Sequence, residues 1–243
     1  FSAVEKLARS LDSLTRKEDP SRYTMIANHA DFSRYNEYHL TTIAQITGWN
    51  LYAGWYGGKQ EDFPAFLDRH HAQLPDQPFM ITEYGADADP RIRSMQPVRF
   101  DKSVEYATAF HQYYLAEIRK RPFVAGAVVW NLADFNSETR TETMPHINNK
   151  GLLTWDRIPK DAYYLYQAGL LKDPYLRITS SAWKYRSGIA DSAGLFCIQP
   201  VQVATNLPEV DIYLNGRFFR KVLTVNGLAE VRLPFVQGKN QVM

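Results

Sequence analysis

Residues 79–87 read FMITEYGAD, an apolar run that ends in a single carboxylate, Glu83, and then turns at Gly85. A glutamate at the end of a buried strand lies on a rigid rim, and βα-repeat proteins place their chemistry at that rim. Roughly one such repeat later, residues 124–135 read VAGAVVWNLADF, a second apolar run that ends in Trp130 and polar residues. A carboxylate that can attack and an aromatic ring that can stack on a sugar, at adjacent strand ends, together indicate carbohydrate chemistry.

Helix and strand patterns alternate from residue 1 to about residue 172. The spacing of apolar residues predicts a first helix that stops near residues 19–22 and further helices at 41–44, 62–73, 104–120 and 161–171. It predicts strands at 23–27, 46–52, 79–83 and from 124 onward. Strands that alternate with helices predict a parallel α/β architecture. Strand ends rich in tyrosine, glutamate and tryptophan favour a (β/α) barrel, and no glycine-rich phosphate loop follows any strand.

The helical period disappears after Pro174. Alternating apolar and polar residues take over at 199–205, 210–214 and 229–235, and the pair Asn215-Gly216 is a strong hairpin signal. Residues 173–243 are therefore predicted to begin an antiparallel β-sandwich. Because Phe1 opens directly into a helix and Met243 closes a strand, we expect the sequence to be an internal piece of a longer protein.

The composition is that of an ordinary globular protein, with 45% hydrophobic and 22% charged residues among 243. The net charge is +2 and the basic residues are scattered, so no nucleic acid or membrane partner is expected. No His, Cys and Asp spacing suggests a metal site, and no cofactor is expected. The pair His70-His71 is predicted to lie on a solvated helix face, and Asp87 and Asp89 to be ordinary loop polarity.

Four stretches together resemble a known family. They are NLYAGWY at 50–56, TEYGAD at 82–87, WNLADF at 130–135 and KGLLTWDRIPKD at 150–161. In this order they resemble glycoside hydrolase family 2, which contains β-galactosidases, β-glucuronidases and β-mannosidases. The resemblance implies an α/β fold in which residues 1–172 form the second half of a (β/α)8 TIM barrel, strands five to eight. Residues 173–243 are similar to part of the immunoglobulin-like β-sandwich domain that follows the barrel in many bacterial members.

The resemblance also implies roles for individual residues. Glu83 matches the nucleophile of a retaining glycosidase, and Tyr52 matches the tyrosine that orients this nucleophile through a hydrogen bond. Trp130 matches the tryptophan that forms the floor of the sugar subsite. Tyr56 and Asn131 are expected beside the substrate, and Asp134 is a further neighbour of the site.

The second carboxylate of the catalytic pair has no match at a strand end. A retaining enzyme needs an acid/base residue about 5 Å from the nucleophile, and the family places it on a glutamate that follows asparagine. Asn36-Glu37 has this sequence but lies in a polar loop between two strands, so it is rejected. We expect the acid/base residue to precede Phe1 and the isolated chain to be inactive.

The substrate is the least constrained property. Asn148 and Lys150 resemble the Asn-x-Lys element with which β-glucuronidases bind the carboxylate of the sugar, but galactosidase-like members carry a similar stretch. The arginine that glucuronidases place shortly before this element has only Arg140 as a counterpart, at a longer spacing. The prediction is therefore a β-galactosidase acting on terminal β-galactosides of oligo- or polysaccharides, with β-glucuronidase as the alternative.

A non-catalytic carbohydrate-binding or structural fragment is the alternative from another class. The expected partner is a carbohydrate substrate, and a homo-oligomer is left open. The single Cys197 does not decide the compartment, although a periplasmic or secreted bacterial enzyme is favoured over a cytoplasmic one.

Overall fold

The computed structural model describes residues 2–243. Their contacts divide the chain into two units. The first comprises Phe1–Ala86 with Tyr113–Leu132, and the second comprises Asp87–Gln112 with Ala133–Met243.

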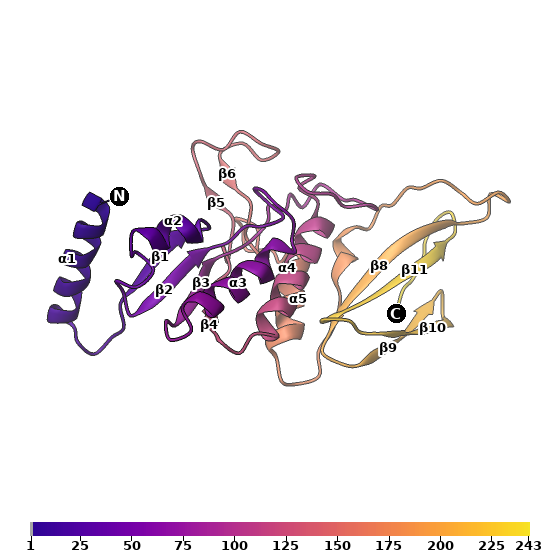
Figure 1. Cartoon of the computed structure of the whole chain (residues 1–243). Coiled ribbons are helices and arrows are strands. Elements are labelled where there is room, and N and C mark those ends of the chain that lie inside the picture. Colours follow the sequence, from indigo (N-terminus) through magenta and orange to yellow (C-terminus); the bar gives the residue numbers. More distant parts are fainter. Residues whose placement is uncertain (1) are drawn as a thin grey trace. The chain divides into compact units, whose positions relative to one another are not determined.

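The first unit is built on a four-stranded parallel sheet (Figure 1). Its strands are neighbours in chain order: β1 (Met25–His29), β2 (Ile46–Asn50), β3 (Phe79–Glu83) and β4 (Val124–Ala127). Since all pairings are parallel, the carboxyl ends of the strands meet at one edge of the sheet. The predicted strands and the parallel α/β architecture are confirmed, with strand bounds that shift by a few residues.

Helices α1 (Ser2–Glu18), α2 (Phe32–Glu37) and α3 (Asp62–Gln73) also belong to the first unit, and α4 (Val104–Arg119) begins in the second. The prediction of a helix at 41–44 is wrong, because these residues form turns. The helix of this connection is instead α2, where the Asp31 side chain accepts a hydrogen bond from Arg34 N at 3.2 Å. This cap satisfies an otherwise unpaired amide of the first turn.

An aromatic core fixes α3 on the sheet. Trp49 of β2 is fully buried and meets Phe66 of α3 edge to face, with ring centroids 4.9 Å apart. His70 of α3 lies 4.2 Å from Phe79 of β3, measured between ring centroids. The prediction of a solvated His70 is wrong: this side chain is buried, whereas His71 stacks on Phe123. The helical spacing alone did not reveal the burial of His70, because a histidine is compatible with both the buried and the solvated face of a helix.

Burial of His70 predicts acid sensitivity. Within residues 2–243 neither ring nitrogen has a hydrogen-bond partner, and desolvation lowers the pKa of His70 to about 4. An unfolded histidine titrates near pKa 6.5. As the pH falls from about 6.5 to about 4, the unfolded state gains a proton that the folded state excludes, so about 2–3 kcal/mol of stability is lost.

His70→Phe is expected to flatten this pH dependence, because phenylalanine has no proton to gain. The urea midpoint, followed by tryptophan fluorescence between pH 7.5 and 4.5, measures the effect. His39→Asn is the matched control, because His39 is exposed and asparagine tolerates its positive φ of 58°. If the urea midpoint of His70→Phe falls with pH as steeply as that of the wild type, burial of His70 is not the source of the acid sensitivity.

The second unit contains α5 (Asp161–Leu170) and mainly antiparallel strands. Two short strands, β5 (Phe135–Asn136) and β6 (Ile147–Asn148), form a hairpin. One sheet has the order β11 (Leu228–Phe235), β8 (Cys197–Thr205), β7 (Leu176–Ile178), and a second pairs β10 (Arg217–Leu223) with β9 (Glu209–Leu214). A short 3-10 helix, η1 (Thr179–Ala182), follows β7.

The predicted hairpin at Asn215-Gly216 is confirmed. Both residues have positive φ, 52° and 79°, as a two-residue turn between twisted strands requires. Strand β10 has no counterpart among the predicted strands, because most of its side chains are exposed and its sequence RFFRKVL does not alternate. Among residues 2–243, no helix combines the length and apolar character needed to cross a bilayer.

Candidate active site

Glu83 is the last residue of β3, and its carboxylate is held by a neighbouring strand end. The hydroxyl of Tyr52, two residues beyond β2, donates to Glu83 Oε2 at 2.9 Å. The backbone amide of Leu51 donates to the carbonyl of Glu83 at 2.8 Å, which joins the two strand ends. The structure therefore brings together the two residues predicted as nucleophile and orienting group.

Tyr52→Phe tests the orienting bond. A hydrogen bond to a charged group contributes on the order of 1.5–3 kcal/mol. If Tyr52 positions the carboxylate during catalysis, we expect kcat of the full-length protein to fall roughly tenfold to hundredfold. Circular dichroism and the melting temperature serve as the control for folding. A variant with wild-type kcat would show that the bond does not assist turnover.

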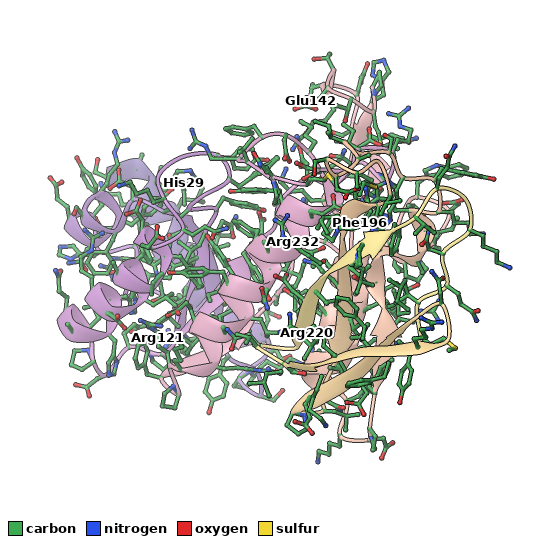
Figure 2. The ribbon with its side chains drawn as sticks, turned by 90° about the vertical axis from the view of Figure 1, so that its right-hand side faces the viewer. His29, Arg121, Glu142, Phe196, Arg220 and Arg232 are labelled. Carbon is green, nitrogen blue, oxygen red and sulfur yellow. The ribbon has the colours of Figure 1, made fainter. Side chains whose placement is uncertain are left out.

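A hollow of about 280 Å³ opens beside Tyr52 in the first unit. Tyr56 lines it, is about half exposed, and packs against Tyr52 with ring centroids 5.0 Å apart. His29, at the carboxyl end of β1, and Asn50 line the same hollow, and His29 is labelled in Figure 2. Aromatic walls with a few polar groups are typical of pockets that bind small molecules.

Trp130 and Asn131 follow β4 in the first unit and are joined by a cis peptide bond. The amide of Trp130 donates to the carbonyl of Tyr84 at 2.8 Å, so its backbone is fixed to the residue that follows Glu83. Trp130 is partly exposed, as a residue that stacks on a ligand must be. Glu37, the rejected acid/base candidate, ends helix α2 rather than a strand.

A buried group of charges in the second unit surrounds Asp87. Lys150 and Asp87 form an ion pair in which both side chains are at most 1% exposed. The other carboxylate oxygen of Asp87 lies 3.0 Å from Lys102 Nζ and 3.4 Å from Arg140 Nη1. We call Asp87, Lys102, Arg140 and Lys150 the Asp87 cluster. The expectation that Asp87 and Asp89 are ordinary polar residues of a loop is wrong, because both side chains are buried.

The cluster holds Asp87 in its charged form. Burial by itself would raise the pKa of Asp87, but the ammonium groups of Lys150 and Lys102 more than offset this and lower the pKa. One carboxylate thus orients three cationic side chains from distant parts of the sequence. Sequence reasoning overlooked Lys102, since no local pattern distinguishes it from a surface lysine.

A second buried ion pair fixes the backbone near Lys150. Lys160 Nζ donates to Asp134 Oδ1 at 2.8 Å, to the carbonyl of Ala88 at 2.8 Å and to the carbonyl of Asn149 at 2.9 Å. Burial lowers the pKa of Lys160 and raises that of Asp134, while the ion pair opposes both shifts. Asn148 is buried, and its side-chain oxygen accepts from Lys150 N at 3.3 Å. The segment that carries Asn148 and Lys150 is therefore rigid.

No group of three or more His, Cys, Asp or Glu side chains within residues 2–243 is placed to hold a metal ion. The chemistry available to the residues above is that of a hydrogen-bonded carboxylate, aromatic surfaces and fixed cations.

Residues 2–172 match the family model described as glycosyl hydrolases family 2, TIM barrel domain. The chain belongs to glycoside hydrolase family 2.

Its relatives are mostly β-glucuronidases. A β-glucuronidase of Bacteroides fragilis is 33% identical over 219 residues, which cover 86% of this chain and 29% of that protein. The structure of Bacteroides uniformis β-glucuronidase 2, covalently bound to cyclophellitol-6-carboxylate aziridine, matches 98% of the chain with a TM-score of 0.91 and 39% identity.

A Bacteroides fragilis protein assigned as a β-galactosidase matches with a TM-score of 0.80 and 26% identity over 98% of this chain and 37% of that protein. The chain spans about 30% of the length of the first two relatives. The preference for a β-galactosidase is thus less well supported than its alternative.

Proposed function

We propose that the protein carrying this chain is a retaining β-glucuronidase. The observation that carries the proposal is the Asp87 cluster, in which Lys150 of the Asn-x-Lys element is held by a buried carboxylate beside Lys102 and Arg140. A glucuronide differs from a galactoside by a carboxylate in place of a neutral primary hydroxyl. Fixed cations are the groups that recognise a carboxylate, and a neutral hydroxyl does not require them.

Glu83 acts as the nucleophile in this proposal. Its carboxylate attacks the anomeric carbon and forms a covalent glycosyl intermediate, which water then hydrolyses. Tyr52 holds the attacking carboxylate in position, and Trp130 and Tyr56 offer aromatic surfaces to the sugar. A second carboxylate must protonate the leaving oxygen and later activate the water, and no described residue is assigned to that role.

The relatives support both the covalent mechanism and the glucuronide substrate of the proposal. The covalent complex of the Bacteroides uniformis enzyme contains a 6-carboxylate on the ligand, the group that a uronate carries. The Bacteroides fragilis relative is a β-glucuronidase of the same family.

A substrate panel tests the assignment. The full-length protein is expected to hydrolyse an aryl β-glucuronide with a kcat/KM at least tenfold above that for the matching aryl β-galactoside. The two substrates share the aglycone, so the ratio reports recognition of the sugar alone. A preference for the galactoside would indicate a β-galactosidase. Hydrolysis of neither substrate would favour a binding or structural role.

We further propose that residues 1–172 form strands five to eight of a (β/α)8 barrel and that residues 173–243 form part of an immunoglobulin-like β-sandwich. Apolar side chains from both sheets of the second unit support the sandwich, because Val203 and Val231 of one sheet belong to the same core cluster as Val210 and Ile212 of the other. Two sheets that share a core are the defining feature of this architecture.

A further inference from the structure

We propose that the second unit carries a non-catalytic binding site for an acidic sugar, in a hollow where β8 begins and β11 ends. The hollow has a volume of about 410 Å³. Its lining, which includes Lys184, Arg186, Phe196, Cys197, Gln199 and Phe235, belongs entirely to the second unit. None of the lining residues belongs to the candidate active site or to the Asp87 cluster. The proposal therefore goes beyond the glucuronidase function proposed above and does not require it.

Hydrogen bonds fix the walls of the hollow. Cys197 and Phe235 are paired across the end of the β8–β11 ladder. Residues 183–196 connect η1 to β8 and supply the opposite wall. Within this connection the Asp191 side chain accepts from the amide of Phe196 at 3.0 Å, and the amide of Asp191 donates to the carbonyl of Phe196 at 2.8 Å. Phe196, labelled in Figure 2, is thus held at the start of β8.

Arg186 is held in the wall by neutral groups. Its Nε donates to the carbonyl of Trp183 at 3.0 Å, its Nη2 donates to the carbonyl of Ser180 at 3.3 Å, and its Nη1 donates to the carbonyl of Pro200. Backbone carbonyls fix the guanidinium group without cancelling its charge, since a guanidinium stays protonated in proteins.

The hollow presents positive charge and no negative charge. Among residues 2–243, no aspartate or glutamate lines it, and neither Lys184 nor Arg186 forms an ion pair. The charges of Glu105 and Asp161 also act on Arg186, but both carboxylates are bound by Arg93. Lys184 is exposed, so its ammonium group is free to meet a ligand. An anion is the ligand that matches this arrangement.

A buried amide adds a second requirement. Gln199 is fully buried, and its Nε2 donates to the carbonyl of Ser187 and to Cys197 Sγ, both at 3.3 Å. Its Oε1 has no hydrogen-bond partner among residues 2–243. Buried acceptors in proteins are nearly always paired with a donor. A ligand that brings a hydroxyl group into the hollow supplies that donor.

An acidic sugar combines the groups that the hollow selects. Its carboxylate or sulfate group suits the ammonium and guanidinium groups, its hydroxyls are donors, and its apolar C–H face suits the rings of Phe196 and Phe235. The chain also belongs to a family of glycoside hydrolases, so glycans are the ligands that the protein meets. We infer that this hollow holds a sugar of an acidic glycan away from the bond that is cleaved.

Calorimetric titration of the full-length Glu83→Gln variant tests the proposal, because a variant without its proposed nucleophile should leave the probes intact. Three probes are compared: a hexasaccharide that alternates glucuronate with N-acetylglucosamine, a sulfated cellohexaose and neutral cellohexaose. Adding Lys184→Glu is expected to weaken one binding site for an acidic probe at least tenfold, because attraction becomes repulsion. Lys172→Glu is the matched control, since it makes the same charge change at an exposed lysine that does not line the hollow. Its affinities should stay within twofold.

Gly188→Val tests the hollow without changing its charge. A β-carbon at Gly188 would lie 2.9 Å from Gln199 Nε2 and 3.4 Å from Cys197 Sγ, so a valine side chain there takes up space beside both groups. The backbone of Gly188 lies outside the left-handed region and accepts valine. The same site should weaken at least fivefold, with circular dichroism and the melting temperature as controls for folding.

The source of the anion follows from which probe responds. A response with the glucuronate hexasaccharide assigns a carboxylate, and a response confined to the sulfated cellohexaose assigns a sulfate ester. With Glu83 intact, Lys184→Glu should keep kcat and KM for an aryl β-glucuronide within twofold. A larger change in these constants would place the lost binding at the catalytic site and overturn the proposal.

Three further results would overturn it. The first is an affinity for both acidic probes that stays within twofold in Lys184→Glu and in Gly188→Val. The second is equal weakening by Lys172→Glu, which would indicate diffuse surface charge. The third is an equal response of neutral cellohexaose. Wild-type protein that cleaves no glucuronide would reject the proposed function alone, because binding in the hollow does not depend on turnover.

Discussion

Glu83→Gln in the full-length protein is expected to lower kcat for an aryl β-glucuronide by about 10⁴-fold or more, as removal of a catalytic nucleophile does. The amide is nearly isosteric with the carboxylate and can still accept from Tyr52, so the fold should be retained. What is lost is the ability to form the covalent glycosyl intermediate. Steady-state kinetics, with the melting temperature as a folding control, measure the effect.

Covalent trapping gives the complementary evidence. A 2-fluoro-glucuronide slows release of the intermediate more than its formation, so peptide mapping should find the label on Glu83. Glu37→Gln is the matched control and is expected to change kcat less than threefold, because Glu37 ends a helix and not a strand. A label on any other carboxylate would reject Glu83 as the nucleophile.

Lys150→Met is expected to lower kcat/KM for the aryl glucuronide roughly tenfold to hundredfold, the equivalent of one charge-assisted contact of about 1.5–3 kcal/mol. Methionine fills a similar space, and Asp87 retains Lys102 and Arg140 as partners. Hydrolysis of the matching galactoside should stay within about threefold, because its neutral hydroxyl makes no such contact.

The ratio between the two substrates separates recognition from stability. A general loss of folded protein would reduce both activities together, whereas loss of uronate recognition changes their ratio. Lys172→Met removes an exposed lysine and should leave the ratio unchanged. Equal losses on both substrates in Lys150→Met would show that the buried ion pair serves the fold alone.

The sequence predicted the strands of the first unit for a physical reason, whereas the contact between Tyr52 and Glu83 was implied by the resemblance to the family. Buried parallel strands are short apolar runs, and their carboxyl ends must share an edge, so polar residues at consecutive ends are brought together. Helix α3 was predicted with its observed bounds because its apolar spacing is regular.

The Asp87 cluster could not be predicted in the same way. Its members lie up to 63 residues apart, and an isolated lysine or aspartate in a loop has the same local pattern whether it is buried or solvated. The buried state of His70 and the helix at Phe32–Glu37 were missed for a related reason, because tertiary contacts and a single capping side chain decide them. Charge pairing between distant segments leaves no periodic signal.

The backbone around Lys150 is held by groups other than the Lys150 side chain. Lys160 binds the carbonyl of Asn149, and a β-carbon at Gly151 would lie 2.2 Å from the amide nitrogen of Asp134, so this stretch has almost no freedom to move. The side chain at 150 can therefore be exchanged without reshaping the loop that presents it. If Lys150 reads the sugar as proposed, a point substitution there would change the sugar preference while the backbone that presents the side chain stays in place.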